Sequence, residues 1–366
     1  MKHICQKKIF IQEYNLTNEL FNKDCIFFDI ETTGFSPASS SIYLIGCLRR
    51  QGNELIIDQF FAEKKTEECE ILQAFITLLQ EYKTIISFNG IGFDIPFVKA
   101  KCATYGIKEH FNDFSYIDIF KHIGNIKFIL KLPNYKQKTI ENFLEISRND
   151  IFSGGELIAV YEDYIKTHSS EAEKLLLLHN FEDVTGMLDL IPILSYFNIL
   201  KGAFSIKETV TSPYTTYDGA EGKEIIITLE NNYCVPKRVS FQFNDYYFTM
   251  NKNTTKIRIP LFDGELRYFH ENYKDYFYLP AEDMAIHKSV AAFVDKQYRK
   301  PAKASNCYTR KTGIFLPQLS NIMTPSFKFE YKDKVSYFEF TSDFNESDAM
   351  IRQYVNHIFE YAMKTR

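Results

Sequence analysis

The most constraining feature of this 366-residue chain is the segment CIFFDIE at residues 25–31, an apolar run that ends in two carboxylates. A short continuous apolar run of this kind predicts a strand buried on both faces. Residues two apart in a strand lie on the same face, so Asp29 and Glu31 are expected to point the same way. A buried carboxylate is unfavourable unless a cation accompanies it. The segment therefore predicts a cation site at the end of a buried strand.

The sequence around this strand predicts a mixed α/β domain over residues 1–204. Apolar and β-rich patterns predict strands at 25–30, 41–48, 54–62 and 84–88, and helices at 67–82, 93–105, 139–144, 155–164 and 170–200. Ser169 or Ser170 is expected to cap the last helix, with Glu173 completing a capping box from Ser170. Three strands, a helix, a strand and then helices is the order of a ribonuclease-H-like sheet flanked by helices, which is the fold we predict.

Residues 205–366 predict a second, C-terminal α+β domain of ordinary size. The turn-rich segment 211–222 is expected to be a linker or loop. Strands are expected at 224–229, 238–243, 246–250 and 256–260, with a tight hairpin at Asn244–Asp245. A helix is expected at about 282–298. A second hairpin should pair 327–331 with 335–340, and a closing helix should run to Met363.

Composition excludes several classes of protein. The seven cysteines are odd in number and none is spaced C-x-x-C, which is typical of a reduced cytoplasmic protein without a disulfide or zinc framework. The sequence shows neither the pattern of a signal peptide nor an apolar run of about 20 residues, so no membrane association is expected. Residues 1–204 carry 21 basic and 27 acidic residues, and residues 205–366 carry 22 and 20. The acidic first half fits a metal site, whereas contacts to a phosphate backbone are expected in the second half.

Two further acidic motifs follow the strand pair: Asp94 in FNGIGFDIPF, and His179 with Asp183 in HNFED. Each motif alone has an ordinary structural interpretation. The D-x-E pair suits a strand that runs into a turn, Asp94 suits a helix N-cap, and a His–Asp pair four residues apart is common on helix surfaces. The apolar sequence on both sides of His179 predicts a buried helix, however, and a buried His–Asp pair needs a partner.

Taken in order, the motifs FDIETTGFSP, ISFNGIGFDIPFV and LLHNFEDVTGML resemble the three exonuclease motifs of the DEDD superfamily of 3′–5′ exonucleases. These motifs are most similar to those of the bacterial ribonuclease-H-like group related to the exonuclease domain of family-B DNA polymerases. YIDIFKH and KTIENFLEISRNDIFSGGE fit the same group, and the resemblance covers roughly residues 20–200.

The resemblance implies catalytic and metal-binding roles for four carboxylates. Asp29, Glu31 and Asp183 would hold one divalent ion, and Asp29 would bridge to a second ion that Asp94 holds directly or through water. Two ions in this arrangement perform in-line phosphodiester hydrolysis, and ligation by oxygen alone favours Mg²⁺ or Mn²⁺. Asp118, in YIDIF, is expected at most to support these ligands without contacting the metal ions itself.

His179 departs from the pattern of that superfamily, which places either a Tyr four residues or a His five residues before the last Asp. Four residues on an α-helix bring two side chains to one face, so we place His179 in the tyrosine-type position. Its expected role is to orient or deprotonate the attacking water, which makes the pH profile differ from that of a tyrosine version. Glu182 is expected to point away from the metals because one residue turns a helix by about 100°.

Substrate contacts are expected in both domains. Thr32, Thr33 and Gly34 let backbone groups approach a terminal nucleotide, Asn89 suits a hydrogen bond to the scissile strand, and Phe93 or Phe35 suits base stacking, although packing explains both rings equally well. In the second domain, residues 296–311 carry six basic residues, no acids and two tyrosines. This pattern fits a phosphate track that includes Lys300, Lys303 and Arg310, or equally a solvated basic loop.

The function predicted from sequence is therefore a metal-dependent 3′–5′ exonuclease that hydrolyses DNA or RNA with two Mg²⁺ or Mn²⁺ ions. Two alternatives stay open at this point. One is a nucleic-acid-binding or assembly protein with a catalytically silent nuclease fold, and the other is a structure-specific endonuclease that uses the same metals.

Overall fold

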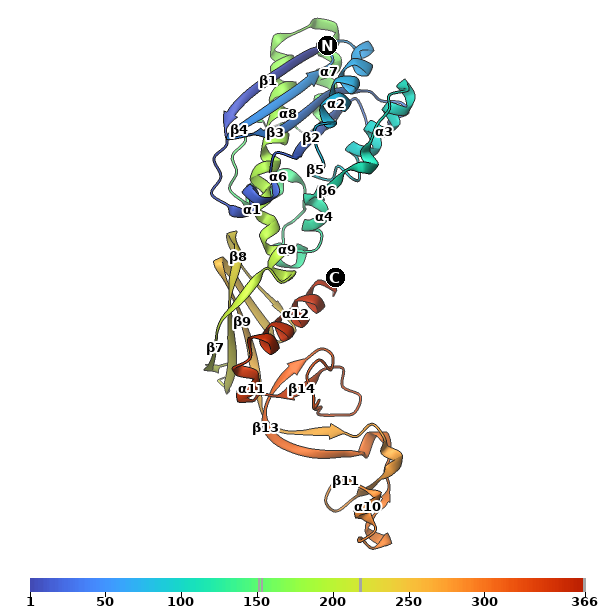
Figure 1. The fold of residues 1–366 in the computed structure, drawn as a ribbon, viewed down its shortest axis with the longest axis vertical. Helices are drawn as coiled ribbons and strands as arrows, with labels where there is room; N and C mark the ends of the chain where they lie inside the picture. Colours follow the sequence, from blue (N-terminus) through green and yellow to red (C-terminus); the bar gives the residue numbers. More distant parts are fainter. Residues whose placement is uncertain (151, 153, 217–218, 365–366) are drawn as a thin grey trace. The chain divides into compact units, whose positions relative to one another are not determined.

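The computed structural model describes residues 1–150, 152, 154–216 and 219–364. The chain forms two compact units, one of residues 1–198 with 233–237 and one of residues 199–232 with 238–366 (Figure 1). In the order of the chain, the elements of the first part are β1 Lys2–Ile9, α1 Asn15–Leu20, β2 Cys25–Thr32, β3 Ile42–Gln51, β4 Glu54–Phe61, α2 Glu68–Leu79, β5 Thr84–Ser87, α3 Asp94–Tyr105, β6 Ser115–Asp118, α4 Ile119–Ile123, α5 Lys127–Leu130, α6 Gln137–Phe143, α7 Gly154–Thr167, α8 Ser170–Leu190 and α9 Leu194–Leu200.

The first unit is built on a six-stranded mixed sheet in the order β1-β4-β3-β2-β5-β6. Strands β2, β3 and β4 form an antiparallel meander, and β5 and β6 add to β2 in parallel. The predicted ribonuclease-H-like architecture is confirmed. β1 was not predicted, because its sequence KHICQKKI is largely polar; it pairs with β4 at the sheet edge, where one face stays in contact with water.

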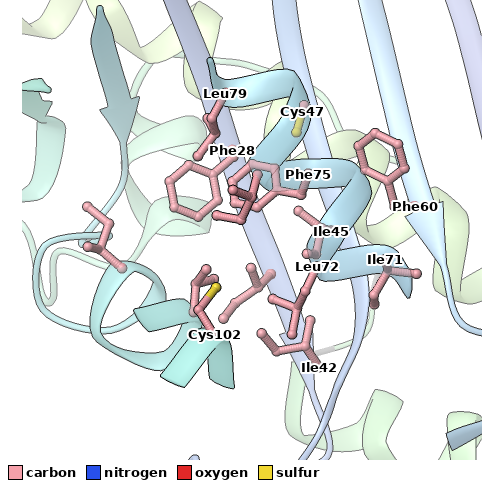
Figure 2. Packing of buried hydrophobic residues seen from close by; sticks show 14 of the residues in the cluster. Phe28, Ile42, Ile45, Cys47, Phe60, Ile71, Leu72, Phe75, Leu79 and Cys102 are labelled. Atoms are coloured by element: carbon pink, nitrogen blue, oxygen red, sulfur yellow. The ribbon is translucent and has the colours of Figure 1, made fainter. Parts of the chain in front are cut away.

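Alternation along β2 sends its side chains to two different layers. Ile26, Phe28 and Ile30 belong to the hydrophobic cluster that α2 and α3 cover. Figure 2 shows this cluster, in which the rings of Phe28 and Phe75 meet with centroids 4.9 Å apart. A strand of period two must then place Asp29 and Glu31 on the opposite face, which α7 and α8 cover. One strand thus supplies both a core layer and the pair of carboxylates.

Helix α8 is the long apolar helix predicted from residue 170. Ser169 is its N-cap and its side chain accepts a hydrogen bond from the Ala172 amide at 3.4 Å. The predicted capping box from Ser170 is wrong, because Glu173 instead contacts the side chains of Lys2 and Tyr164. By length and hydropathy, 170–200 is also the one stretch among the described residues that matches a membrane span, but 72% of its apolar window is buried in the protein, as in the core helix of a soluble domain.

The second unit is rich in β-structure. Its elements are β7 Phe204–Thr215, β8 Glu221–Phe243, β9 Tyr246–Phe269, β10 Tyr276–Leu279, β11 Met284–His287, α10 Lys288–Ala291, β12 Lys300–Pro301, β13 Tyr308–Gln318, β14 Ser336–Glu339, α11 Ser342–Asn345 and α12 Asp348–Lys364. A five-stranded sheet has the order β14-β13-β9-β8-β7, and a three-stranded sheet has the order β11-β10-β12. The aromatic rings of Phe204 and Phe248 both pack on Phe359 of α12.

Several predictions for the second unit are corrected by the structure. Most of the supposed linker 211–222 is paired strand, since β7 runs to Thr215 and β8 starts at Glu221; Tyr217 and Asp218 lie outside the described residues. β7 is an edge strand, and an edge tolerates the proline that suggested a turn. The four short strands merge into β8 and β9, joined at the predicted hairpin where Asn244 has a φ of 49°.

The predicted helix over 282–298 is also wrong. Residues 284–287 form β11, and only Lys288–Ala291 are α-helical. Asp283 has a left-handed backbone with a φ of 50°, and its carboxylate accepts hydrogen bonds from the hydroxyls of Tyr278 and Tyr308 at 2.6 Å each. These bonds, the second of them between residues 25 apart, stabilise the turn against the local helical pattern. In place of the second predicted hairpin, the structure has the strand β14 and an isolated bridge between Phe327 and Tyr337. The predicted closing helix is confirmed as α12.

Candidate metal and active site

The face of β2 that carries Asp29 and Glu31 lies against α8 at unusually close range. Gly46 of β3 is the cross-strand partner of Asp29. A Cβ at Gly46 would lie 2.1 Å from Oδ1 of Asn180 and 2.8 Å from a methyl group of Val184, so the helix can approach only because this residue is glycine. Asn180 is fully buried and donates a hydrogen bond from Nδ2 to Oδ2 of Asp29 at 3.2 Å. Its Oδ1 accepts a bond from Gln59 of β4 at 3.1 Å. The orientation of Asp29 is therefore set by a buried amide chain.

Asp94 opens α3 after a tight turn that follows β5. The turn contains Asn89, whose φ of 66° is left-handed, and Asp118 accepts hydrogen bonds from the amides of Asn89 at 3.0 Å and Ile91 at 3.2 Å. Asp94 itself reaches back to β2, where its Oδ1 accepts the Ile30 amide at 3.2 Å. Asp118 thus supports the turn, and Asp94 lies beside the backbone between Asp29 and Glu31.

His179 and Asp183 project from the same face of α8 toward Glu31. The Nε2 atom of His179 lies 3.5 Å from Oε1 of Glu31 and 3.2 Å from Oδ2 of Asp183. One ligand atom from each of these three residues lies within 4.8 Å of the other two, close enough to share a metal ion. His179 is only 3% exposed and Glu31 7%, so the group is shielded from water.

A loop that precedes α7 supplies further functional residues that the sequence analysis missed. Oδ2 of Asp150 lies 2.7 Å from Nδ1 of His179 and also accepts a bond from Nζ of Lys138 at 2.9 Å. Arg148 pairs with Oδ1 of Asp183 through Nη2 and with both oxygens of Glu141 through Nη1. No periodicity marks this loop; its residues lie within the segment KTIENFLEISRNDIFSGGE that fits the resembling group, but the charged run R-N-D is common in surface loops and did not by itself indicate a role.

Glu182 has a structural place, as expected from its position on the helix. Its carboxylate accepts hydrogen bonds from the amides of Asn149 at 3.0 Å and Asp150 at 2.8 Å. It therefore holds the loop that carries Asp150 against α8, on a different side of the helix from Asp183.

A pocket of about 430 Å³ brings most of the predicted site residues together. It is lined by Asp29, Glu31, Thr32, Gly34, Phe35, Asn89, Phe93, Asp94, Lys136, Lys138, Ile158, His179 and Asp183, among others. Thr33 is not part of this lining; its Oγ1 accepts the Ser41 amide at 2.9 Å and so fixes the turn after β2. Lys136 is exposed, and no ion-pair partner for it is found among the described residues.

Lys300, Lys303 and Arg310 belong to the second unit and do not line this pocket. Arg310 is engaged within its own unit, where it contacts Glu265 at 3.4 Å and donates to the carbonyl of Glu282 at 2.8 Å. Tyr308, one of the two tyrosines of this segment, is buried and donates a hydrogen bond to Asp283. Lys300 and Lys303 are exposed.

The electrostatics of the pocket show a deficit of positive charge. Burial raises the pKa of Asp29 well above its ordinary value, and the neighbouring Asp94, Glu31 and Asp183 raise it further. Burial, Asp183 and Asp94 likewise raise the pKa of Glu31 well above its ordinary value. Burial is also the main cause that raises the pKa of Asp94 to about 7. A cation placed among these carboxylates would stabilise their charged forms.

The residues present fit a divalent-metal site. Asp29, Glu31, Asp94 and Asp183 would provide oxygen ligands, and His179 could provide a nitrogen. Among the described residues, no hydrogen-bond donor reaches the buried Glu31 carboxylate, so its lone pairs remain available for a ligand role. Carboxylate oxygens suit Mg²⁺ or Mn²⁺, whereas imidazole suits transition metals.

Comparison with known proteins agrees with the fold. The family model of the RNase H superfamily matches residues 26–195, and the first unit is a ribonuclease-H-like domain. No curated protein matches the chain in sequence. This family match supports a nuclease function in general terms.

Two groups of solved structures are similar to part of the chain. One is the family B DNA polymerase of the hyperthermophilic archaeon Pyrobaculum calidifontis, with 16% identity and a TM-score of 0.38, over 48% of this chain and 26% of the polymerase. Another is E. coli exonuclease I in complex with a dT13 oligonucleotide, with 12% identity and a TM-score of 0.31, over 57% of this chain and 55% of the exonuclease. The chain thus spans about a quarter of the polymerase and about half of the exonuclease that it matches.

Proposed function

We propose that this protein is a metal-dependent 3′–5′ exonuclease that hydrolyses the phosphodiester bonds of DNA or RNA by a two-metal-ion mechanism. One observation carries the proposal: four carboxylates from β2, α3 and α8 line a single pocket, and among the described residues no Lys or Arg pairs with three of them, Asp29, Glu31 and Asp94. Arg148 pairs with one oxygen of Asp183, and Lys138 pairs with Asp150, so neither cation reaches Asp29 or Asp94.

In this proposal, Asp29, Glu31 and Asp183 hold the first ion, and Asp29 with Asp94 holds the second. The ions would position and activate a water and draw charge from the leaving 3′ oxygen. The protein's part is to fix its carboxylates beforehand. Asn180 orients Asp29, the Ile30 amide orients Asp94, and Arg148 holds one oxygen of Asp183 so that the other faces the pocket.

The mouth of the pocket suits the end of a nucleic-acid strand. Phe35 is 85% exposed and meets Phe93 edge-to-face at 6.4 Å, which offers an aromatic surface for an unstacked base. Exposed Lys136 lines the same pocket and provides a positive charge for a phosphate. A volume of about 430 Å³ suits a small ligand such as one nucleotide unit. The 3′–5′ polarity rests on the resemblance of the three sequence motifs.

The proposal is tested with 5′-labelled DNA and RNA strands incubated with Mg²⁺ or Mn²⁺ between pH 6 and 9. A 3′–5′ exonuclease gives a ladder of shortened labelled products. Asp29→Asn and Asp183→Asn should each abolish the ladder while circular dichroism shows that the variant stays folded. Asp163→Asn, an exposed aspartate on α7, is the matched control and should keep full activity.

Other outcomes identify the alternatives. Absence of a ladder on every substrate overturns the proposal, and metal-independent binding that survives Asp183→Asn then indicates a silent nuclease fold. Cleavage of a circular single strand indicates an endonuclease, because a circle has no end for an exonuclease. The DNA and RNA arms together decide the substrate.

A further inference from the structure

We propose that His179 is a nitrogen ligand of the first metal ion, alongside Glu31 and Asp183, and that the site therefore binds a first-row transition-metal ion in preference to Mg²⁺. The inference rests on the proposed metal-dependent function but assigns a ligand and a metal class that the four-carboxylate pattern does not contain. It also changes the role of His179, since a ring nitrogen bound to a metal cannot accept a proton from water.

The distances between the three side chains support a shared ion. Two ligand atoms bound to one ion at about 2.1 Å lie about 3.0–3.4 Å apart at octahedral or tetrahedral angles. Nε2 of His179 lies 3.2 Å from Oδ2 of Asp183 and 3.5 Å from Oε1 of Glu31. These separations need almost no rearrangement before an ion is bound.

The ring of His179 is held in the orientation that a ligand requires. Its Nδ1 lies 2.7 Å from Oδ2 of Asp150, a carboxylate that is itself buried. Because an ionised carboxylate only accepts hydrogen bonds, a proton on Nδ1 completes the bond to Asp150 and leaves Nε2, which faces Glu31 and Asp183, as the nitrogen that would bind the ion. This is the carboxylate–histidine–metal arrangement, in which the carboxylate fixes the tautomer and strengthens the ligand.

Asp150 is in turn fixed from several sides, as a dedicated positioning residue would be. Lys138 donates to its Oδ2 at 2.9 Å, and the Phe152 amide donates to its Oδ1 at 3.0 Å. Glu182 accepts the Asp150 amide at 2.8 Å, which ties the loop to α8. The second ligand is equally constrained, because Arg148 takes Oδ1 of Asp183 and leaves Oδ2 toward His179.

The burial of Glu31 and His179 favours a shared metal ion over a simple ion pair between the two side chains. Glu31 and His179 are both more than nine-tenths buried, and the Glu31 carboxylate lies near Nε2 of His179, at 3.5 Å, and near the carboxylate of Asp183. An ion among the three atoms satisfies Glu31, His179 and Asp183 together. Imidazole nitrogen favours transition metals over Mg²⁺, which retains its water and oxygen ligands.

The test measures the metal itself, with Mn²⁺ as the spectroscopic probe. Pulsed electron paramagnetic resonance of the Mn²⁺-loaded full-length protein should show coupling to an imidazole ¹⁴N nucleus. His179→Gln should remove that coupling, and His110→Gln, at an exposed histidine of the same unit, should keep it. Equilibrium titration should show Mn²⁺ bound about 10–100-fold more weakly by His179→Gln, and about 10-fold more weakly by Asp150→Asn. The dissociation constant for Mg²⁺ should change by less than about 3-fold in both variants, because oxygen ligands dominate its binding.

Wild-type protein alone is enough to overturn the inference, so the result does not depend on whether a variant folds. Bound Mn²⁺ without ¹⁴N coupling means that His179 is not a ligand, and failure to bind Mn²⁺ refutes the site altogether. A ¹⁴N-coupled ion in a protein that cuts neither DNA nor RNA would leave this inference standing while the proposed nuclease function fails. The two proposals are therefore separable.

Discussion

Replacing Asp94 by Asn should stabilise the metal-free protein at neutral and alkaline pH. Burial raises the pKa of Asp94 to about 7 in the folded protein, against 3.8 for an ordinary aspartate, and Asp118 and Asp183 contribute repulsion. Asparagine keeps an oxygen that can accept the Ile30 amide, so the hydrogen bond that Asp94 makes is retained. The substitution therefore removes a buried charge without removing its contact.

The sign and size follow from proton linkage. At a pH between the pKa of Asp94 in the unfolded protein and its higher pKa in the folded protein, the folded protein binds more protons than the unfolded one. The free energy of unfolding therefore falls as the pH rises through this window, and it becomes constant above the folded pKa. A pKa raised from 3.8 to about 7 corresponds to about 4 kcal/mol at pH 8. Because Asp29, Glu31 and Asp94 titrate together, the four kcal/mol is an upper value, and we expect a gain of roughly 1–4 kcal/mol. Below pH 4 the gain should vanish.

Thermal melts in excess EDTA at pH 5, 6, 7 and 8 measure this effect. A domain of this size shifts by about 2–4 °C per kcal/mol, so Asp94→Asn should melt at least about 2 °C above the wild type at pH 8. Its pH dependence should also be flatter between pH 5 and 7. Asp163→Asn, which is exposed, should behave as the wild type. Equal or lower stability of Asp94→Asn at pH 8, or a wild type whose stability rises from pH 5 to 8, would refute the reasoning.

Three further predictions concern the packing and the surroundings of the site. Gly46→Ala should destabilise the protein by about 1–3 kcal/mol in urea unfolding, because its Cβ would overlap Asn180, whereas Gly155→Ala, with open space around it, should not; equal stability of both variants would contradict the close approach of α8. Asp118→Ala should lower kcat on the order of 10–100-fold and also lower the melting temperature, because the turn that places Asp94 loses its buried acceptor; unchanged kcat would count against that role. Phe35→Ala should weaken single-strand binding by about 1–3 kcal/mol in fluorescence anisotropy without affecting stability, and equal affinity would exclude a stacking surface.

Much of the first unit was predictable because its signals are local. The apolar run before Asp29 predicted the central strand, and the helical spacing around His179 predicted the long helix. In both cases the side-chain period of one element is enough to decide which face is buried. The relation of Asp94 to the strand pair followed from motif order, and the structure brings all three acids to one pocket.

The second unit was less predictable because its strands depend on distant partners. The segment around Pro213 has turn composition, but pairing with β8 makes it an edge strand. Asp283 lies at the start of the predicted helix, where two tyrosines, one of them 25 residues away, donate to its carboxylate and favour a turn before β11. Propensity is a weak prior wherever such long-range contacts compete with it.

The sequence by itself determined the buried strand, the carboxylates that it carries and the helix face shared by His179 and Asp183, since each follows from the repeat of a single strand or helix. Only the tertiary structure decided what those side chains touch. Asp150, 29 residues from His179 in the chain, contacts the ring of His179 at Nδ1 and fixes the orientation of that ring. Gly46 lacks a Cβ, and this allows α8 to pack close to the sheet. These contacts depend on the packing of separate elements, which no local pattern encodes.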